Sequence, residues 1–142
     1  MTKLPPEDQP DAIDVGPVRG IPIIEPDDPR FEDERRAWSA ARTKAQAMHS
    51  PDELLQGLSD GDWMVRFEVV DRLIAHARED QRTVPALIAA ANDSISAVRE
   101  AVVMRLHVFN DEQAKAAIRQ AMSDDDPDVR VAALYAAQQA ED

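Results

Sequence analysis

Histidine is the residue type best suited to metal binding or acid–base chemistry in this chain, but its spacing defines no site. His49, His76 and His107 are far apart, and no two histidines stand one helical turn apart as a helical metal motif requires. The sequence has no cysteine, which excludes disulfides, thiolate nucleophiles and cysteine-ligated zinc or iron–sulfur centres. We therefore expect no metal and no other cofactor.

Other catalytic patterns are also missing from the sequence. With only 4 glycines, none of them in a suitable pattern, there is neither a glycine-rich phosphate loop nor a nucleophile elbow. The 28 acidic residues are too numerous for an acid–base pair to stand out among solvated carboxylates. We expect a protein that is not an enzyme.

The net charge of −12 bears on the kind of partner. It opposes approach to a phosphate backbone, so we expect no nucleic-acid partner. It could steer a basic protein towards the chain, although acidity of this kind more often serves only solubility. No apolar run has the roughly 18 residues of a membrane-spanning helix, and the first thirty residues lack a secretory profile, so we expect a cytoplasmic protein without a membrane partner.

Residues 1–28 differ in composition from the rest of the chain. Seven of the ten prolines lie in residues 1–30, mixed with acidic residues at no helical or strand period. This composition predicts an extended, disordered tail. Residues 15–24 are unusually apolar for such a tail, and two hypotheses are equally open: they dock on a partner, or they pack along their own domain.

Residues 29–49 predict the first helix. Asp28 before Pro29 is a typical helix start, and Ser50 with Glu53 predicts a capping box that opens the next helix. Apolar side chains recur between these points at spacings of three, four and seven residues, which places them on one side of the helix. They are Phe31, Trp38, Ala41, Ala45 and Met48.

A polar signature then recurs three times. In each copy an aspartate stands six residues before an arginine, and a valine directly precedes the arginine. The arginines are 33 and 31 residues apart, and apolar residues recur at fixed distances from each one, which is typical of a repeat architecture. The three pairs are Asp60 with Arg66, Asp93 with Arg99, and Asp124 with Arg130.

Each unit predicts a first helix, an acidic turn and a longer second helix that opens just before the arginine. One such hairpin cannot bury its apolar face alone, so the units must stack into an all-α solenoid over residues 29–142. The repeats are expected at 51–79, 82–110 and 111–140. The expected helices are 51–58 and 62–78, 83–91 and 94–109, and 111–122 and 127–140. The second unit has Ile95 where the others have an aspartate, and Ser94 is the alternative helix cap.

The signature over residues 51–142 resembles HEAT repeats, in particular the short bacterial HEAT-like type first named from phycobilisome lyases. The motifs of ankyrin and tetratricopeptide repeats are absent. The resemblance implies a right-handed α-α superhelix in which the aspartates and arginines of the signature form a ladder along the hairpin turns. The side-chain chemistry agrees, because a turn aspartate accepts backbone amides and a guanidinium donates to carboxylates and carbonyls.

The resemblance also implies that the second helices line the surface that binds a partner. Taking Val65, Val69 and Leu73 as the buried side, helical geometry exposes a second set of positions on each of these helices. Their mixture of guanidinium, thioether and aromatic groups resembles an interface, although an ordinary solvated face is an equally good interpretation. The expected partner-binding residues are Glu68, Asp71, Arg72, Met104, Arg105, Val108, Tyr135 and Gln139, beside Ala75, Ala101, Ala132 and Ala136.

The leading hypothesis is a non-catalytic scaffold that binds a protein partner. Alternatives are an enzyme-associated protein of the chromophore-lyase type, a neutraliser of a basic protein, and, disfavoured by charge, a DNA glycosylase. Trp63 is expected to cover the first helix rather than to anchor a partner. The alanine-rich last helix is apolar on several sides, so the tail or a second copy, forming a homodimer, is expected to cover it.

Overall fold

The computed structural model describes residues 29–141. The predicted tail over 1–28 and the predicted cap at Asp28 lie outside the described residues, so the domain boundary at residue 28 stays a prediction. By their contacts the residues group into two units, 1–35 and 36–142, divided within the first helix. In the first unit Arg35 forms an ion pair with Glu32 and lies over the ring of Phe31.

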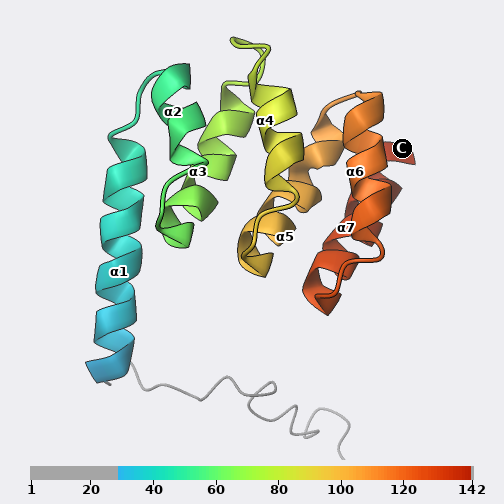
Figure 1. The fold of residues 1–142 in the computed structure, drawn as a ribbon. Helices are drawn as coiled ribbons and strands as arrows, with labels where there is room; N and C mark the ends of the chain where they lie inside the picture. The colour runs from blue at the N-terminus through green and yellow to red at the C-terminus, as the bar shows by residue number, and fades with distance from the viewer. Residues whose placement is uncertain (1–28, 142) are drawn as a thin grey trace, which may run out of the picture. The chain divides into compact units, whose positions relative to one another are not determined.

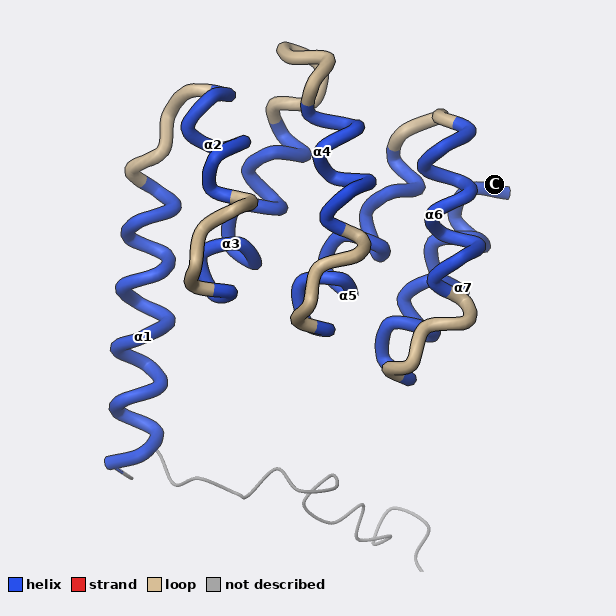
Figure 2. Tube along the Cα trace, in the orientation of Figure 1, coloured by secondary structure: helices blue, strands red, loops and turns tan. Residues whose placement is uncertain are grey.

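The part of the chain that the structure describes consists of helices and turns, with no strand (Figures 1 and 2). The all-α prediction is therefore confirmed. In chain order the elements are α1 (Pro29–Gln46), α2 (Pro51–Gly57), α3 (Trp63–Ala75), α4 (Thr83–Ala90), α5 (Ser96–Arg105), the short 3-10 helix η3 (Leu106–Val108), α6 (Glu112–Ala121) and α7 (Pro127–Glu141).

Within residues 36–142 the helices from α2 onwards form three hairpins that stack side by side (Figure 1). The first helices of the hairpins, α2, α4 and α6, form one layer, and the second helices, α3, α5 and α7, form the other. Contacts between α5 and α7 are the most extensive of the fold. This is the solenoid of helical pairs that the repeated signature predicts.

Side-chain caps explain where several helices begin. Ser50 accepts a hydrogen bond from the amide of Glu53 at 3.1 Å, as the predicted capping box requires. The return contact differs from the expected one, because the hydroxyl of Ser50 donates to the carboxylate of Glu53. Asp62 caps α3 by accepting from the amide of Met64, and Asp111 caps α6 in the same way.

The start of α5 corrects one prediction. Ile95 occupies the cap position, and no side chain caps the helix, so Ser94 does not take that role. The nearest compensation comes from Asp93, whose carboxylate accepts the amide of Ile95 at 2.9 Å. The carboxylate of Asp93 therefore stabilises the turn directly before the helix.

Helix ends fall short of their predicted positions. The first helix ends at Gln46 rather than at residue 49, and α3 ends at Ala75 rather than at residue 78. The second helix of the middle repeat starts at Ser96 and passes into η3, which ends at Val108. Final turns are stabilised less than helix interiors because their carbonyls lack partners within the helix, which explains the shorter ends.

One continuous apolar core joins the three hairpins. The valine before each signature arginine is fully buried, at Val65, Val98 and Val129. The apolar residue twelve positions before each arginine is buried as well, at Leu54, Leu87 and Ile118. Equivalent residues therefore occupy equivalent depths, as the common register of the repeats predicts.

Aromatic side chains close the first repeat against α1. The Trp38 ring meets the rings of Trp63 and Phe67 edge-on, with centroids 5.3 Å apart in both pairs. Ala41 and Ala45, one and two turns further along α1, are buried against the same core. This packing supports the interpretation of Trp63 as a cover for the first helix.

Gly57 offers a test of how closely this end is packed. A methyl group at Gly57 would lie 2.7 Å from Val69 Cγ2 and 2.9 Å from the sulfur of Met48. We expect Gly57→Ala to lower the free energy of unfolding by about 1–3 kcal/mol through overpacking, despite the better helix propensity of alanine. Urea unfolding followed by circular dichroism measures the change.

The matched control is Gly61→Ala, because a methyl group there meets no atom within 4 Å. This variant should be close to neutral. Equal effects of the two substitutions would contradict the close packing between α2 and α3.

Candidate functional site

The signature residues form cross-links between successive hairpin turns. Arg66, near the start of α3, donates from Nε and Nη2 to the two carboxylate oxygens of Asp93 at 2.8 and 3.1 Å. Its Nη1 donates to the backbone carbonyl of Asp60 in its own turn at 2.7 Å. One guanidinium group therefore braces its own turn and holds the next one.

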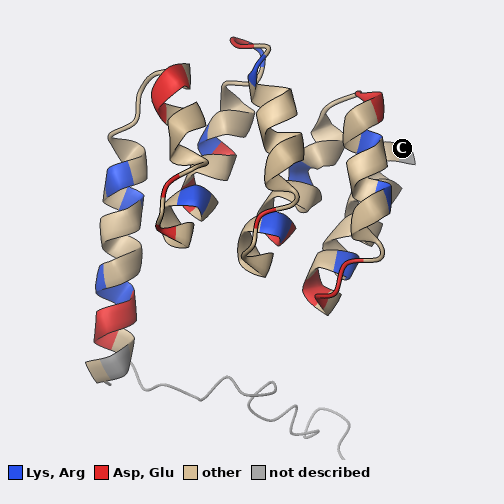
Figure 3. Ribbon diagram, viewed as in Figure 1, with Lys and Arg blue, Asp and Glu red and all other residues tan. Residues whose placement is uncertain are grey.

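The second and third hairpins are joined in the same way. Arg99 donates from Nε and Nη2 to Asp124, both at 3.0 Å, and from Nη1 to the carbonyl of Asp93 at 2.9 Å. Both arginine side chains are largely buried, with 13% exposure for Arg66 and 18% for Arg99. In Figure 3 the ribbon of the acidic turns runs beside basic positions of the helices.

The two ends of this ladder differ. At the first turn a lysine replaces the arginine, and Lys44 of α1 lies 2.7 Å from the carboxylate of Asp60. Sequence reasoning missed Lys44, because it lies outside the repeat register and carries no signature. At the last turn Arg130 is exposed and donates from Nη1 to the carbonyls of Asp124 and Asp125.

The ladder shifts the proton affinities of its members. Hydrogen bonds from Arg99 hold the pKa of Asp124 below its ordinary value of 3.8, and those from Lys44 lower the pKa of Asp60. Burial alone would raise the pKa of Asp93, but the bonds from Arg66 and the Ile95 amide lower it overall. The carboxylates of the ladder are therefore held ionised.

The layer of α3, α5 and α7 carries the predicted partner-binding residues. Arg105 of α5 pairs with Asp71 of α3 at 3.0 Å, and both side chains are well exposed. Beside Arg105, Val108 is 52% exposed, and Tyr135 of α7 is 46% exposed. Gln139 is also exposed, one turn beyond Tyr135.

His107 joins this set, although sequence reasoning did not select it. Its ring meets the ring of Tyr135 edge-on, with the centroids 5.9 Å apart. Because His107 and Val108 belong to η3 whereas Tyr135 belongs to α7, only the stacking of the repeats brings them together. We call Arg105, His107, Val108 and Tyr135 the α5–α7 patch.

Three of the predicted partner-binding residues are less accessible than expected. Arg72 is half-buried and donates from Nη2 to the carbonyl of Met48 at 3.0 Å, so it ties α3 to the end of α1. Met104 is half-buried against the core. Glu68 is 20% exposed and lies 3.6 Å from Arg42 of α1. The expectation that Arg72 is exposed was wrong, because its guanidinium points back to the carbonyl of Met48 at the end of α1.

Two alanines expected on the exposed side of α7 are buried instead. Ala132 and Ala136 are 2% and 0% exposed. The reason is the extensive contact between α5 and α7, which small side chains permit because they let the helices approach closely. The exposed side of α7 is rotated towards Leu134 and Tyr135.

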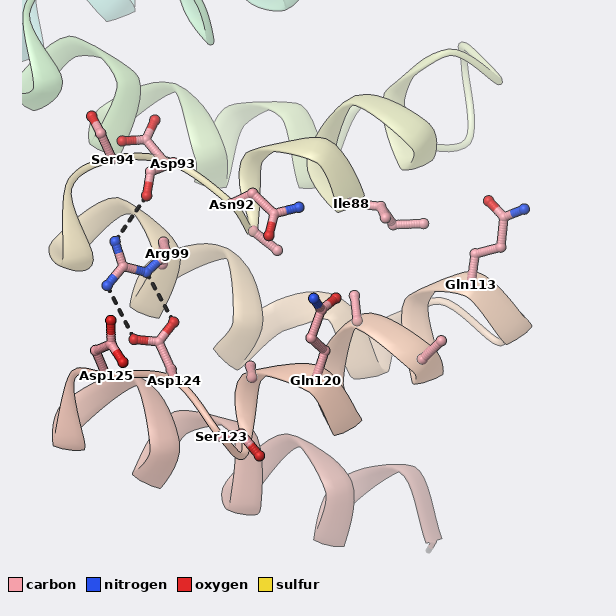
Figure 4. A pocket seen from close by; sticks show the side chains of 14 residues that line it. Ile88, Asn92, Asp93, Ser94, Arg99, Gln113, Gln120, Ser123, Asp124 and Asp125 are labelled. Carbon is pink, nitrogen blue, oxygen red and sulfur yellow. Dashed lines mark hydrogen bonds and ion pairs between the residues drawn. The ribbon is translucent and has the colours of Figure 1, made fainter.

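A groove of about 800 Å³ opens on the opposite layer, between α4 and α6 (Figure 4). Ile88 lines it from α4, and Gln113 and Gln120 line it from α6. Arg99 lies at the end nearest the turns, with its three donor nitrogens already bonded to Asp124 and Asp93. The groove therefore offers a ligand no unpaired cation.

The rest of residues 29–141 offers little further chemistry. Among these residues no group of three or more histidines or carboxylates could hold a metal ion. His76 bonds to Glu79 of its own turn, 2.8 Å away. No helix in this part of the chain has the length and apolar character needed to cross a membrane.

Comparison with sequence models of known families identifies the family of the chain. A sequence model of the family described as HEAT repeats matches residues 51–138, which is more than half of the chain. No curated protein sequence matches the chain significantly. The matched residues run from the start of α2 almost to the end of α7, so they cover all three hairpins.

The cross-links between turns predict a measurable coupling. We expect Arg99→Gln and Asp124→Asn each to lower the free energy of unfolding by about 1–3 kcal/mol, because each leaves a largely buried polar partner unpaired. In a double-mutant cycle the pair should show a coupling of about 1–2 kcal/mol. Urea unfolding of the four chains measures it.

Arg82 provides the control for this cycle, because it also joins two repeats through Asp52, at 2.6 Å, but on an exposed surface. Asp52→Asn removes this pair and leaves the one between Arg82 and Asp80, so it should change stability little, since solvent screens exposed ion pairs. Additive effects of the Arg99 and Asp124 substitutions would contradict the role of this cross-link.

The lowered pKa values predict acid sensitivity. As the pH falls, the unfolded chain binds protons at ordinary carboxylate pKa values before the folded ladder does, so stability is complete above about pH 5 and declines below about pH 4. Glu100 acts in the opposite direction, because burial and the nearby Asp128 raise its pKa. Unfolding between pH 7 and pH 3 should show a net decline. Asp124→Asn should make that decline shallower, and an unchanged slope would count against the proposed cause.

Proposed function

Because the chain belongs to the HEAT repeat family, whose members generally mediate protein–protein interactions, we propose that it binds a protein partner through the layer of α3, α5 and α7. The observation that carries this proposal is the α5–α7 patch. It combines an exposed aliphatic side chain, an exposed tyrosine and an accessible guanidinium on neighbouring repeats. Tyrosine and arginine are over-represented among the residues that dominate binding energy in protein interfaces.

Contacts within and beneath the patch favour a preformed surface. Tyr135 is held by the edge-on contact with His107, and Arg105 is held by Asp71. The helices that carry these residues are fixed by the apolar core and by the Arg99–Asp124 cross-link. A surface ordered before binding loses less conformational entropy when the partner docks.

The proposed centre of binding differs from the one that the sequence favoured. Arg72 is engaged in holding α1, and Met104 lies against the core, so the centre moves from α3 towards α5 and α7. Asp71 and Gln139 then lie at the edge of the surface, where charged and polar groups favour orientation and specificity over affinity. The proposal needs neither a catalytic residue nor a cofactor.

A photo-crosslinking amino acid at Gln139 tests the proposal, because Gln139 is exposed one turn from Tyr135. We expect it to capture a protein from a cell lysate. Tyr135→Ala and Val108→Asp, made in the same crosslinking chain, should each lower the captured amount by about tenfold or more, as expected for residues at the centre of an interface. Quantitative mass spectrometry of the captured protein measures this.

The control places the crosslinker at Ala89, which is exposed on α4 in the opposite layer. This chain should not capture the same protein. Circular dichroism must show that Tyr135→Ala remains folded. Equal capture from both positions, or capture unaffected by both substitutions, would contradict binding at the α5–α7 patch.

A further inference from the structure

The C-terminal end of the stack exposes a stripe of residues that the inner repeats bury. In α3 the signature arginine is followed four and seven residues later by Val70 and Leu73, on the same side of the helix. That side faces the next hairpin, because Arg66 bonds to Asp93 from it. Val70 and Leu73 are fully buried, and so are Val103 and Leu106 at the equivalent positions of α5.

The same stripe of α7 consists of Arg130, Leu134 and Ala137. Leu134 is 54% exposed, Ala137 is half-buried and Arg130 is exposed. In the first two hairpins these positions pack against the next hairpin. In the last hairpin the same positions are at least partly exposed to solvent. A partner that covers this stripe would remove its apolar surface from water, which is favourable.

Arg130 has the donors that the inner arginines use for the next turn. Its Nη1 braces its own turn, as in the other repeats, through the carbonyl of Asp124 at 2.7 Å. Among the residues that the structure describes, no acceptor hydrogen-bonds to its Nε or Nη2. In Arg66 and Arg99 these two nitrogens grip the aspartate of the following turn. The Nε and Nη2 groups of Arg130 can therefore donate together to one carboxylate.

A groove of about 410 Å³ continues this surface between α6 and α7. Ile118, Met122 and Ala137 line its apolar part. Arg119 adds an exposed cation, and Lys115 adds a second that pairs with Glu112 of its own helix at 3.4 Å. In the preceding repeat the residue equivalent to Arg119 is Ile88. Ile88 faces the next helix across the groove of Figure 4. The end of an otherwise acidic chain therefore combines apolar and basic groups.

We infer that this end is a second interaction surface, which accepts a helical hairpin with an aspartate in its turn and acidic side chains on its first helix. Charge complementarity selects this occupant, because the aspartate fits Arg130 and an acidic side chain on the helix fits Arg119. A second copy of the chain fits poorly. Its turn aspartates Asp60, Asp93 and Asp124 are already paired.

A hairpin of known structure, joined to the chain in place of residues 140–142, tests the inference. Residues 109–141 are repeated directly after Gln139, which stands nine residues after its arginine, as Val108 does. The link gives the added hairpin a high effective concentration. The added Asp124 should then pair with Arg130. A double-mutant cycle between Arg130→Gln and Asp124→Asn in the added copy should show a coupling on the order of tenfold in the unfolding equilibrium constant.

The unextended chain is the control, because Arg130→Gln and Leu134→Gln should change its urea midpoint much less than that of the extended chain. In the added copy, Gln120→Glu should raise the midpoint relative to Gln120→Lys, because this position faces Arg119. Together these results would support an acceptor for an acidic hairpin.

Three results would overturn the inference. The first is an added hairpin that stays unfolded, as shown by proteolysis. The second is a folded extension in which Arg130 and the added Asp124 are not coupled. The third is a dimer of the unextended chain in sedimentation that Leu134→Glu dissociates, because a second copy would then occupy this end. None of these outcomes depends on binding at the α5–α7 patch, so the two proposals can fail separately.

Discussion

A largely buried guanidinium group at each junction holds one hairpin turn to the next, and the rest of the fold depends on that geometry. Arg66 and Arg99 each bond to a carbonyl of their own turn and to both oxygens of the next aspartate. Such a group fixes the distance and the orientation between two turns at once. The apolar core supplies most of the stabilising free energy, but it is non-directional, so the ladder is what sets the register in which the helices stack.

The two ends of the stack meet this constraint differently. At the first repeat, Lys44 takes the place of the missing arginine and Trp38 closes the apolar side against Trp63 and Phe67. At the last repeat, Arg130 and Leu134 are an arginine and an aliphatic residue, as at the inner junctions, but they are exposed to solvent. Every repeat buries its apolar face only against a neighbour. Whether the first and last hairpins are covered therefore decides which surfaces remain for partners. We propose two such surfaces, the α5–α7 patch and the end of α6 and α7.

The net charge of the chain indicates little about binding until the positions of the charged residues are known. Taken as a whole, −12 opposes approach to polyanions and favours solubility. Several of the aspartates, however, serve the turns, where arginine, lysine or backbone amides hold them. The surfaces proposed for binding contain Arg105, Arg119 and Arg130 instead. A partner that docks there meets local groups within a Debye length of about 8 Å, beyond which the overall charge is largely screened.

By itself the sequence determined the helical hairpins, their common register and the buried valines Val65, Val98 and Val129, because the spacing within a helix fixes which residues share one side of it. It predicted the six residues of the ladder, but not Lys44. Only the tertiary structure decided which way the outer side of each helix faces: Ala132 and Ala136 are buried, Arg72 is held at Met48, and His107 meets Tyr135. The physical reason is that periodicity fixes the angles between residues around one helix axis, whereas exposure depends on how closely and at what rotation the neighbouring helices pack.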